Sequence, residues 1–149
     1  MKNLFDTETY QETNTRINNL SADSKGQWGK MSVGQMLAHL QIGFKILLKG
    51  KPVRRLLLGR LIGWMVKKIM YNDAPWKNSL PTSPIFIIKD ERKFEEEKKQ
   101  LLDLIEKFYQ AGSFGIGDKI HPFFGKFTAE QWGKTMWKHI DHHLRQFGV

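Results

Sequence analysis

Apolar residues recur at intervals of three and four residues in four separate segments of the chain, which is the spacing of one helix face. In the last segment, Trp132, Met136 and Phe147 fall on one narrow arc when successive residues are rotated by about 100°. Glycine and proline residues, which are typical of helix ends and loops, lie between the segments. The predicted helices cover approximately residues 6–20, 33–50, 91–111 and 129–147.

Two of these helices start at a capping box. In this motif a hydroxyl side chain accepts a hydrogen bond from the backbone three residues later, and a Gln side chain there bonds back. Ser32 and Gln35 match one box, and Thr128 and Gln131 match the other. Asp90 is the predicted N-cap residue of the third helix.

The second and third helices are separated by residues 51–89, a link far longer than antiparallel neighbours need. Its length predicts a crossover within a four-helix bundle, with a short extra helix of its own at about residues 54–71. No segment alternates polar and apolar residues long enough to require a strand, and residues 85–88 are the only β-like run. We therefore predict an all-α four-helix bundle that forms a single domain over residues 1–149.

The composition is that of a globular domain, with 40% hydrophobic and 26% charged residues, which excludes disordered and fibrous classes. The chain contains no cysteine, which excludes disulfides, thiolate metal ligands and a catalytic cysteine. The N-terminal residues lack the apolar core of a signal peptide. The most apolar stretch, residues 56–70, is interrupted by Arg60, Lys67 and Lys68, so we expect a cytoplasmic protein without a membrane-spanning segment.

The apolar arc of the last helix also carries His139 and His143, one turn apart. Two imidazoles at this spacing can bind one metal ion, but two core histidines bonded to carbonyl groups would have the same pattern. His39 lies on an apolar arc of the second helix. A buried imidazole without a hydrogen-bond partner lowers the stability of the folded protein by about 1–3 kcal/mol. Three inward histidines can satisfy one another by sharing a cation, which leaves a coordination position open. The candidate metal ligands are His39, His139 and His143.

Six further residues have different predicted roles. His121 precedes a proline, and a role in a turn is the favoured interpretation. His142 lies about 100° from His143 around the helix, so we expect it in solvent or in a local pair. Gln146 either orients a ligand of the site or is an exposed amide at the helix end. Lys138 is predicted to point away from the apolar arc, as are Asp141 and Arg145.

Two motifs of the chain resemble the DinB/YfiT-like superfamily of metal-binding four-helix bundles. Its members carry one histidine on the second helix and an H-x-x-x-H-x-x-Q motif near the C-terminus. The matching residues are His39 in MLAHL, and His139, His143 and Gln146 in HIDHHLRQ. The resemblance covers essentially the whole chain, and residues 121–148 resemble one uncharacterised branch. It implies a divalent metal, usually zinc or nickel, held by the three histidines.

Characterised members of that superfamily include S-transferases and isomerases that use a low-molecular-weight thiol, whereas other members have no known activity. A cation held by three neutral imidazoles would lower the pKa of a bound thiol or water. Because the chain has no cysteine, the thiol must come from a second small molecule, whereas a bound water would support hydrolysis. We expect a thiol-dependent transferase that acts on a small-molecule substrate. The alternative is a non-catalytic metal-binding or membrane-associated accessory protein.

The formal net charge is +9, and residues 24–72 contain ten Lys and Arg but no Asp or Glu. This long basic insert departs from the superfamily pattern. Residues 54–71 form a basic amphipathic segment, which either caps the bundle, the simpler interpretation, or lies on an anionic membrane or a partner. Clustered charge also attracts nucleic acid, but we do not expect that partner because neither a recognition helix nor an aromatic stacking platform is recognisable. Trp137 and Leu144 form a second apolar flank, which is either core or the surface of a homodimer.

Overall fold

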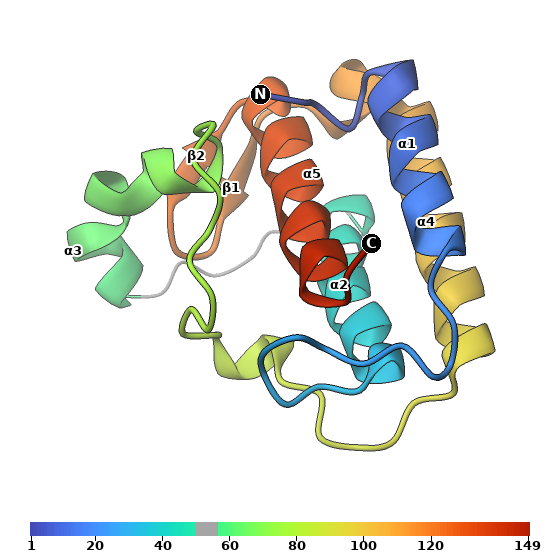
Figure 1. Cartoon of the computed structure of the whole chain (residues 1–149). Coiled ribbons are helices and arrows are strands. Elements are labelled where there is room, and N and C mark those ends of the chain that lie inside the picture. The colour runs from blue at the N-terminus through green and yellow to red at the C-terminus, as the bar shows by residue number, and fades with distance from the viewer. Residues whose placement is uncertain (50–56) are drawn as a thin grey trace.

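The computed structural model describes residues 1–49 and 57–149, and these residues are mostly helical (Figure 1). Four of the helices correspond to the four predicted from apolar spacing, and a shorter one lies in the link between the second and the third long helix, as predicted. The elements are α1 (Thr7–Asn18), α2 (Val33–Leu48), α3 (Leu57–Val66), the 3₁₀ helices η1 (Lys67–Met70) and η2 (Pro84–Phe86), α4 (Phe94–Ile116), β1 (Lys119–His121), β2 (Gly125–Phe127) and α5 (Ala129–Gln146).

The helices α2 and α4 run side by side in the same direction. Gln35, in the first turn of α2, donates to the carbonyl of Asp90 just before α4. Farther along both helices, the rings of Phe44 and Phe108 meet edge to face at a centroid distance of 5.4 Å. Parallel neighbours need a long connection, which explains the length of the link between them.

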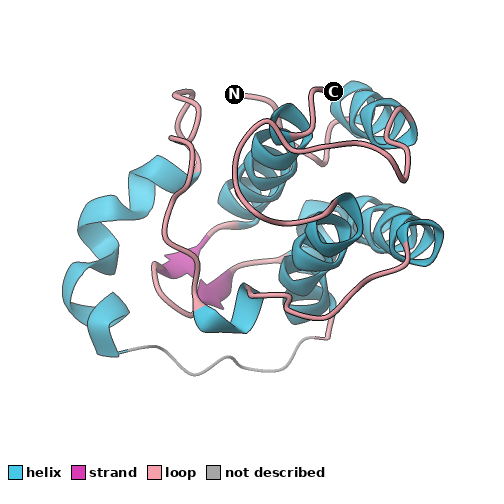
Figure 2. Ribbon diagram, turned by 60° about the horizontal axis from the view of Figure 1, so that its bottom comes forward, coloured by secondary structure: helices cyan, strands magenta, loops and turns pink. Residues whose placement is uncertain are grey.

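The helix α1 runs parallel to α5 on the other side of the core, and the four long helices lie together in both ribbon views (Figure 2). Leu4, before α1, donates to the carbonyl of Gly133 near the start of α5. Arg16, near the end of α1, donates to Asp141 at 2.8 Å. Leu144 is fully buried and Trp137 packs against the core, so the second apolar flank of α5 is core. The homodimer stays a prediction.

Both predicted capping boxes are present. The Ser32 hydroxyl accepts from the Gln35 amide at 3.2 Å, and the Gln35 side chain accepts from the Ser32 amide at 3.0 Å. Thr128 and Gln131 make the same reciprocal pair at the start of α5, with both distances at 3.2 Å. The two helices that carry the candidate ligands therefore begin where the sequence predicts.

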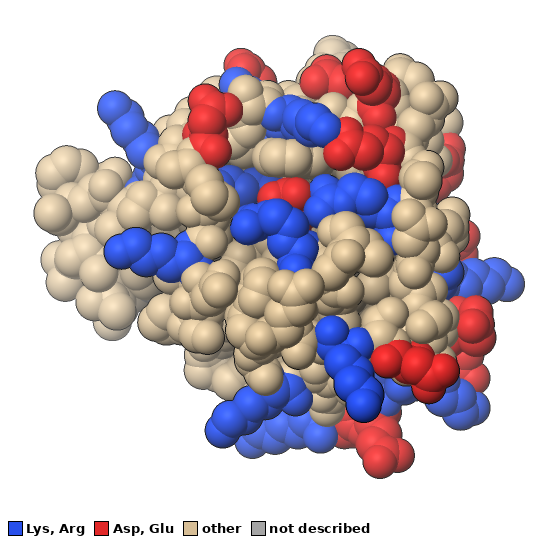
Figure 3. Space-filling model, in the orientation of Figure 1, with Lys and Arg blue, Asp and Glu red and all other residues tan. Residues whose placement is uncertain are grey.

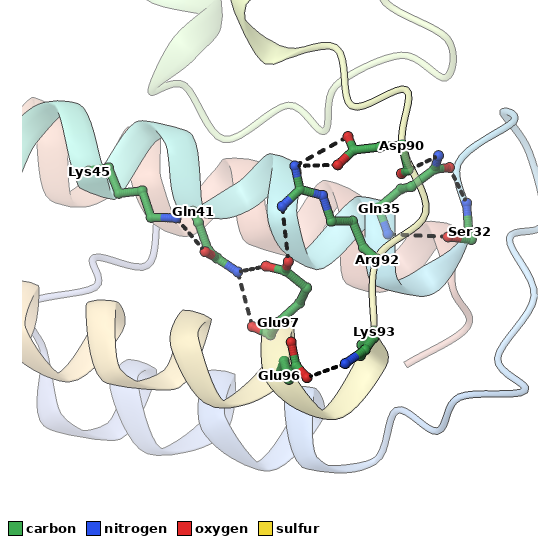
Figure 4. Close-up of polar contacts among 9 residues, drawn as sticks. All are labelled: Ser32, Gln35, Gln41, Lys45, Asp90, Arg92, Lys93, Glu96 and Glu97. Atoms are coloured by element: carbon green, nitrogen blue, oxygen red, sulfur yellow. Dashed lines mark hydrogen bonds and ion pairs between the residues drawn. The ribbon is translucent and has the colours of Figure 1, made fainter.

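The start of α4 differs from the prediction, because its N-cap residue is Lys93 and not Asp90. Asp90 pairs instead with Arg92, with an oxygen–nitrogen distance of 2.9 Å. Glu97, buried in the first turn of α4, accepts from the Gln41 side chain of α2 at 2.6 Å and from Arg92 at 3.3 Å (Figure 4). This polar cluster joins the first turn of α4 to α2.

Replacing Glu97 with alanine should lower the free energy of unfolding by about 1–3 kcal/mol, because Gln41 would lose its carboxylate acceptor inside the protein. The matched control is Glu96→Ala at the neighbouring position, where an exposed carboxylate pairs with the exposed Lys93. Urea unfolding of both variants measures the difference. Equal losses for the two variants would contradict a stabilising role for the buried cluster.

A short antiparallel hairpin of β1 and β2 connects α4 to α5, with Lys119 opposite Phe127 and His121 opposite Gly125. The sequence analysis did not identify these strands, because strands of three residues are too short to produce a recognisable alternation. The β-like run at residues 85–88 is not a strand, and η2 lies there instead. The third helix was predicted to end at Gly112. In α4 the helical backbone is interrupted at this residue, where φ is +61°, and one more helical turn follows.

His121 has the predicted role in a turn. Its Nδ1 accepts hydrogen bonds from the amides of Phe123 and Phe124, at 3.1 and 3.2 Å. Its ring stacks on Phe127 and Trp132, with centroid distances of 5.5 and 5.4 Å. Burial lowers the pKa of His121 to about 4, so the imidazole is neutral in the folded protein at neutral pH.

The lowered pKa of His121 predicts a loss of stability in acid. The unfolded chain, with an ordinary pKa of 6.5, binds more protons than the folded chain between pH 6.5 and about 4. The free energy of unfolding should therefore fall as pH falls through this range, by about 3 kcal/mol from this residue. His121→Asn keeps an acceptor for the two amides but does not titrate. Unfolding curves of the variant should show a weaker acid dependence, and an unchanged dependence would contradict the assignment.

The short helix α3 contacts the hairpin through two glycines. A side-chain carbon at Gly59 or Gly63 would collide with the backbone of Phe123. The large apolar side chains of α3 are exposed, so the interpretation of this segment as a cap on the core was wrong. Arg54 and Arg55, at the start of the predicted segment, lie outside the described residues. Among the described helices, none combines the length and the apolar character needed to cross a bilayer.

Lys138, which was predicted to point away from the apolar arc of the last helix, is buried. Its ammonium group donates to the carbonyls of Ile69 and Asn72 at 2.7 and 2.8 Å, and to the Asn72 side chain at 2.6 Å. The link between α2 and α4 therefore folds back over this side of α5. Lys138 supplies the hydrogen-bond donor for two backbone carbonyls of the link. Periodicity places Lys138 opposite the core but cannot reveal that a second layer of chain covers it.

Candidate metal centre

Three histidines from two helices converge on one point between α2 and α5. One nitrogen of each ring of His39, His139 and His143 lies within 4.8 Å of the corresponding nitrogen of the other two. The ring centroids are 4.7–5.1 Å apart. These are the three candidate ligands from the sequence, and the structure brings all of them together.

The antiparallel packing of α2 and α5 produces this convergence. His39 lies opposite His139, and one turn later along α2 the small Gly43 faces the side chain of Met136. A methyl group at Gly43 would lie 3.2 Å from the terminal carbon of Met136, so glycine here leaves room for the end of this side chain. Met136 and Trp132 belong to the hydrophobic core on this side.

The two ring nitrogens of His39 have different partners. Nδ1 lies 2.8 Å from the carbonyl oxygen of Phe86 in η2, which can only accept, so Nδ1 carries the proton. Nε2 of His39 therefore has the lone pair, and it accepts a hydrogen bond from Nε2 of His139 at 2.9 Å. A carbonyl partner on the far nitrogen is the usual arrangement for an imidazole that binds a metal.

His143 is oriented in the same way by Gln146. Nδ1 of His143 lies 2.8 Å from Oε1 of Gln146, while Nε2 of Gln146 donates to the Trp28 carbonyl at 2.6 Å. Because the bond to Trp28 fixes the amide, its oxygen faces the ring and Nδ1 of His143 is the donor. Gln146 is buried, so the interpretation as an exposed amide at the helix end is wrong.

All three imidazoles are neutral at neutral pH. Burial lowers the pKa of His39. Burial and the neighbouring histidines lower the pKa of His139 well below its ordinary value, and they lower the pKa of His143 to about 3. In His39 and His143 the remaining proton is on Nδ1, so Nε2 of each ring has a lone pair that can bind a cation, whereas His139 would bind through Nε2 with its proton on Nδ1.

The donor set fits a divalent cation of the zinc type. Imidazole nitrogens bind zinc at about 2.0–2.1 Å, which in a tetrahedral site separates two such nitrogens by about 3.3 Å. The Nε2 atoms of His39 and His139 are 2.9 Å apart, and no two ligand nitrogens of the cluster are more than 4.8 Å apart. The tetrahedral separation lies between these two distances. This cluster of three histidines can hold a metal ion with small adjustments of the side chains.

Aromatic rings from the link enclose the cluster, and the sequence analysis missed them. The Trp76 ring lies 5.6 Å from His139, and the Phe86 ring lies 5.7 Å from His39. A pocket of about 170 Å³ opens beside His39. Its lining consists of Met31, His39, Thr82, Phe86, Ile87 and Ile88.

His142 is buried, which contradicts the expectation that it lies in solvent or in a local pair. Its ring lies 5.9 Å from the ring of Trp28 and 5.7 Å from that of Trp76. It is not one of the three clustered histidines. Among the described residues, Nδ1 of His142 has no hydrogen-bond partner.

The acidic residues nearest in sequence to the two histidines of α5 form ion pairs away from the cluster. Asp141 forms ion pairs with Arg16 of α1 at 2.8 Å and with Arg145 at 2.9 Å. Glu130 pairs with Lys134 on the first turns of α5. Among the described residues, the cluster thus consists of three imidazoles and includes no carboxylate.

Comparison with known proteins places the chain in one family. No curated protein and no solved structure matches it. The model of a family described as "Protein of unknown function (DUF1569)" matches residues 2–148, which is nearly the whole chain. The protein belongs to the DUF1569 family.

Proposed function

We propose that the protein binds one divalent cation, zinc or nickel, through His39, His139 and His143. The observation that carries the proposal is the convergence of three neutral imidazoles, two of which have Nδ1 held by an acceptor. Neutral histidine nitrogens are the ligands that zinc and nickel favour. Three protein ligands leave a position for a small molecule, which is typical of catalytic sites.

We further propose that this metal centre belongs to an enzyme of the thiol-dependent S-transferase type. A divalent cation at this site supplies a charge that lowers the pKa of a bound thiol. The thiol must come from a second small molecule, because the chain has no cysteine. In the transfer a sulfur–carbon bond forms, the leaving group departs from that carbon with its electron pair, and the thiol proton passes to solvent. The mostly apolar pocket beside His39 would receive the electrophile.

A relation to the DinB/YfiT-like four-helix bundles is part of the same proposal. Its support is the presence of four long helices that lie together (Figure 2). The positions of the histidines on α2 and α5 match the motifs of that superfamily. Under this proposal, Gln146 positions His143 and does not contact the reacting atoms.

The metal content of protein prepared without a histidine tag tests the first proposal. Elemental analysis should find about one zinc or nickel per chain, or the apoprotein should take up about one equivalent of zinc. A chain that neither retains nor takes up a divalent cation would overturn it. The transferase proposal is tested on the zinc-loaded protein by following the loss of free 2-mercaptoethanol in the presence of an alkyl halide. Hydrolysis of the halide without loss of thiol, or no turnover, would contradict it.

A further inference from the structure

The helix α3 presents its apolar side chains to the outside. Leu57, Leu61 and Trp64 have 77%, 72% and 71% of their surface exposed. Monomeric domains seldom expose so many large apolar side chains together, and such patches mark interaction sites. The exposed apolar residues of this helix are Leu57, Leu58, Leu61, Ile62, Trp64 and Met65.

The orientation of α3 is imposed by its two buried glycines. At about 100° per residue the six apolar side chains span an arc of about 160°, and Gly59 and Gly63 lie on the opposite side. Only glycine fits against the backbone of Phe123, because a side-chain carbon at either position would collide with it. The helix therefore cannot turn its apolar arc toward the hairpin without losing this contact.

Positive charge borders the apolar arc. Arg60 is exposed on its flank, and Lys68 is exposed just beyond the helix. In Figure 3 the projecting α3 region is almost entirely uncharged, with blue side chains beside it. The sequence has no Asp or Glu between residues 24 and 72, so no acidic side chain from this stretch offsets the charge.

We propose that α3 is an interfacial helix that docks the protein on an anionic phospholipid surface. A helix with an apolar face and flanking Arg and Lys lies in the plane of the membrane interface. Burial of its apolar side chains and attraction of its charges to anionic lipids both contribute to the binding free energy. Trp64, at the edge of the arc, has the side chain that favours the headgroup level. A second copy of the chain fits less well, since each copy carries a formal net charge of +9 and the two would repel each other.

The docking surface is firmly connected to the rest of the molecule. The carbonyl of Ile69 in η1, directly after α3, accepts hydrogen bonds from Lys138 of α5 and from the Trp76 ring nitrogen. Ile69 itself is half-exposed, so its side chain can extend the apolar surface of α3. Docking through α3 would therefore hold the whole domain at the lipid surface.

Cosedimentation with vesicles tests the proposal. Vesicles with about 30% phosphatidylserine in phosphatidylcholine should bind the full chain at low salt, at least about tenfold more tightly than pure phosphatidylcholine. About 0.5 M salt should weaken binding to the anionic vesicles, since it screens the charges. Arg60→Gln should reduce the preference for anionic vesicles and its salt dependence.

The double variant Leu61→Ser/Trp64→Ser removes two exposed apolar side chains and should weaken vesicle binding by at least about tenfold. Because both positions are exposed, its circular dichroism should match the wild type. Phe114→Ser is the matched control, since Phe114 is fully exposed on α4, and it should bind vesicles like the wild type. Absence of salt-sensitive binding, or equal binding by the double variant, would overturn the proposal. A wild-type dimer that the double variant converts to a monomer would also overturn it, in favour of a second copy.

Discussion

Substitution of His39 by alanine is expected to weaken zinc binding by about 1000-fold, because it removes one of three ligands. His39 is also the only one of the three that α2 contributes, so two ligands one turn apart on α5 would remain. Gln146→Ala should weaken zinc binding by about 10–100-fold, since Gln146 orients the ring of His143 but is not itself a ligand of the cation. Competition with a coloured chelator at neutral pH measures each affinity.

The matched control for this series is His142→Ala. His142 is adjacent to His143 and buried, but it is not among the clustered nitrogens. Its replacement should leave the zinc affinity within a few-fold of the wild type while removing an imidazole of the same kind. Equal losses for His39→Ala and His142→Ala would contradict the assignment of the ligands. Circular dichroism of each variant should match that of the wild type, which would show that the helices remain.

Truncation of Phe108 to alanine should lower the free energy of unfolding by about 3–5 kcal/mol. Phe108 is completely buried where α4 meets α2 and the N-terminal segment. Its ring stacks on Phe5 at 4.8 Å and meets Phe44 edge to face at 5.4 Å. Removing it would leave a cavity that both helices border.

Phe114→Ala on the same helix is the control, because Phe114 has no buried surface and should contribute almost nothing. Phe108→Leu keeps most of the volume, and it provides a measurable variant if the alanine protein does not fold. Thermal and urea unfolding of the three variants give the comparison. A loss in Phe108→Ala no greater than in Phe114→Ala would contradict the packing of α4 against α2.

The sequence predicts the helices and the ligands well because both depend on local periodicity. A hydroxyl followed three residues later by Gln marks the starts of α2 and α5, and both boxes form. From those starts, a rotation of about 100° per residue places His39, His139 and His143 on apolar faces. The structure brings the three rings together, as expected.

The parts that the sequence did not predict depend on contacts between distant segments. The carbonyl of Phe86 orients His39, and a backbone carbonyl has no residue signature. Trp76 and Trp28 flank His142 only because the link between α2 and α4 and the loop between α1 and α2 pass over α5. Lys138 is buried for the same reason.

The orientation of α3 shows a second limit. Periodicity correctly identifies an amphipathic helix, but it does not state which neighbour its apolar face meets. Here the protein contacts Gly59 and Gly63, and the large side chains face outward. The informative signal was the pair of glycines four residues apart, which permits a close backbone contact on the face opposite the apolar arc.

X-ray absorption at the zinc edge of the zinc-loaded protein is the most direct test of a metal ion shared by His39, His139 and His143. The account predicts about three imidazole nitrogens at about 2.0–2.1 Å and one further light ligand. In His39→Ala the imidazole contribution should fall. A spectrum with one imidazole or none, or one that is identical in His39→Ala, would contradict a cation held jointly by α2 and α5.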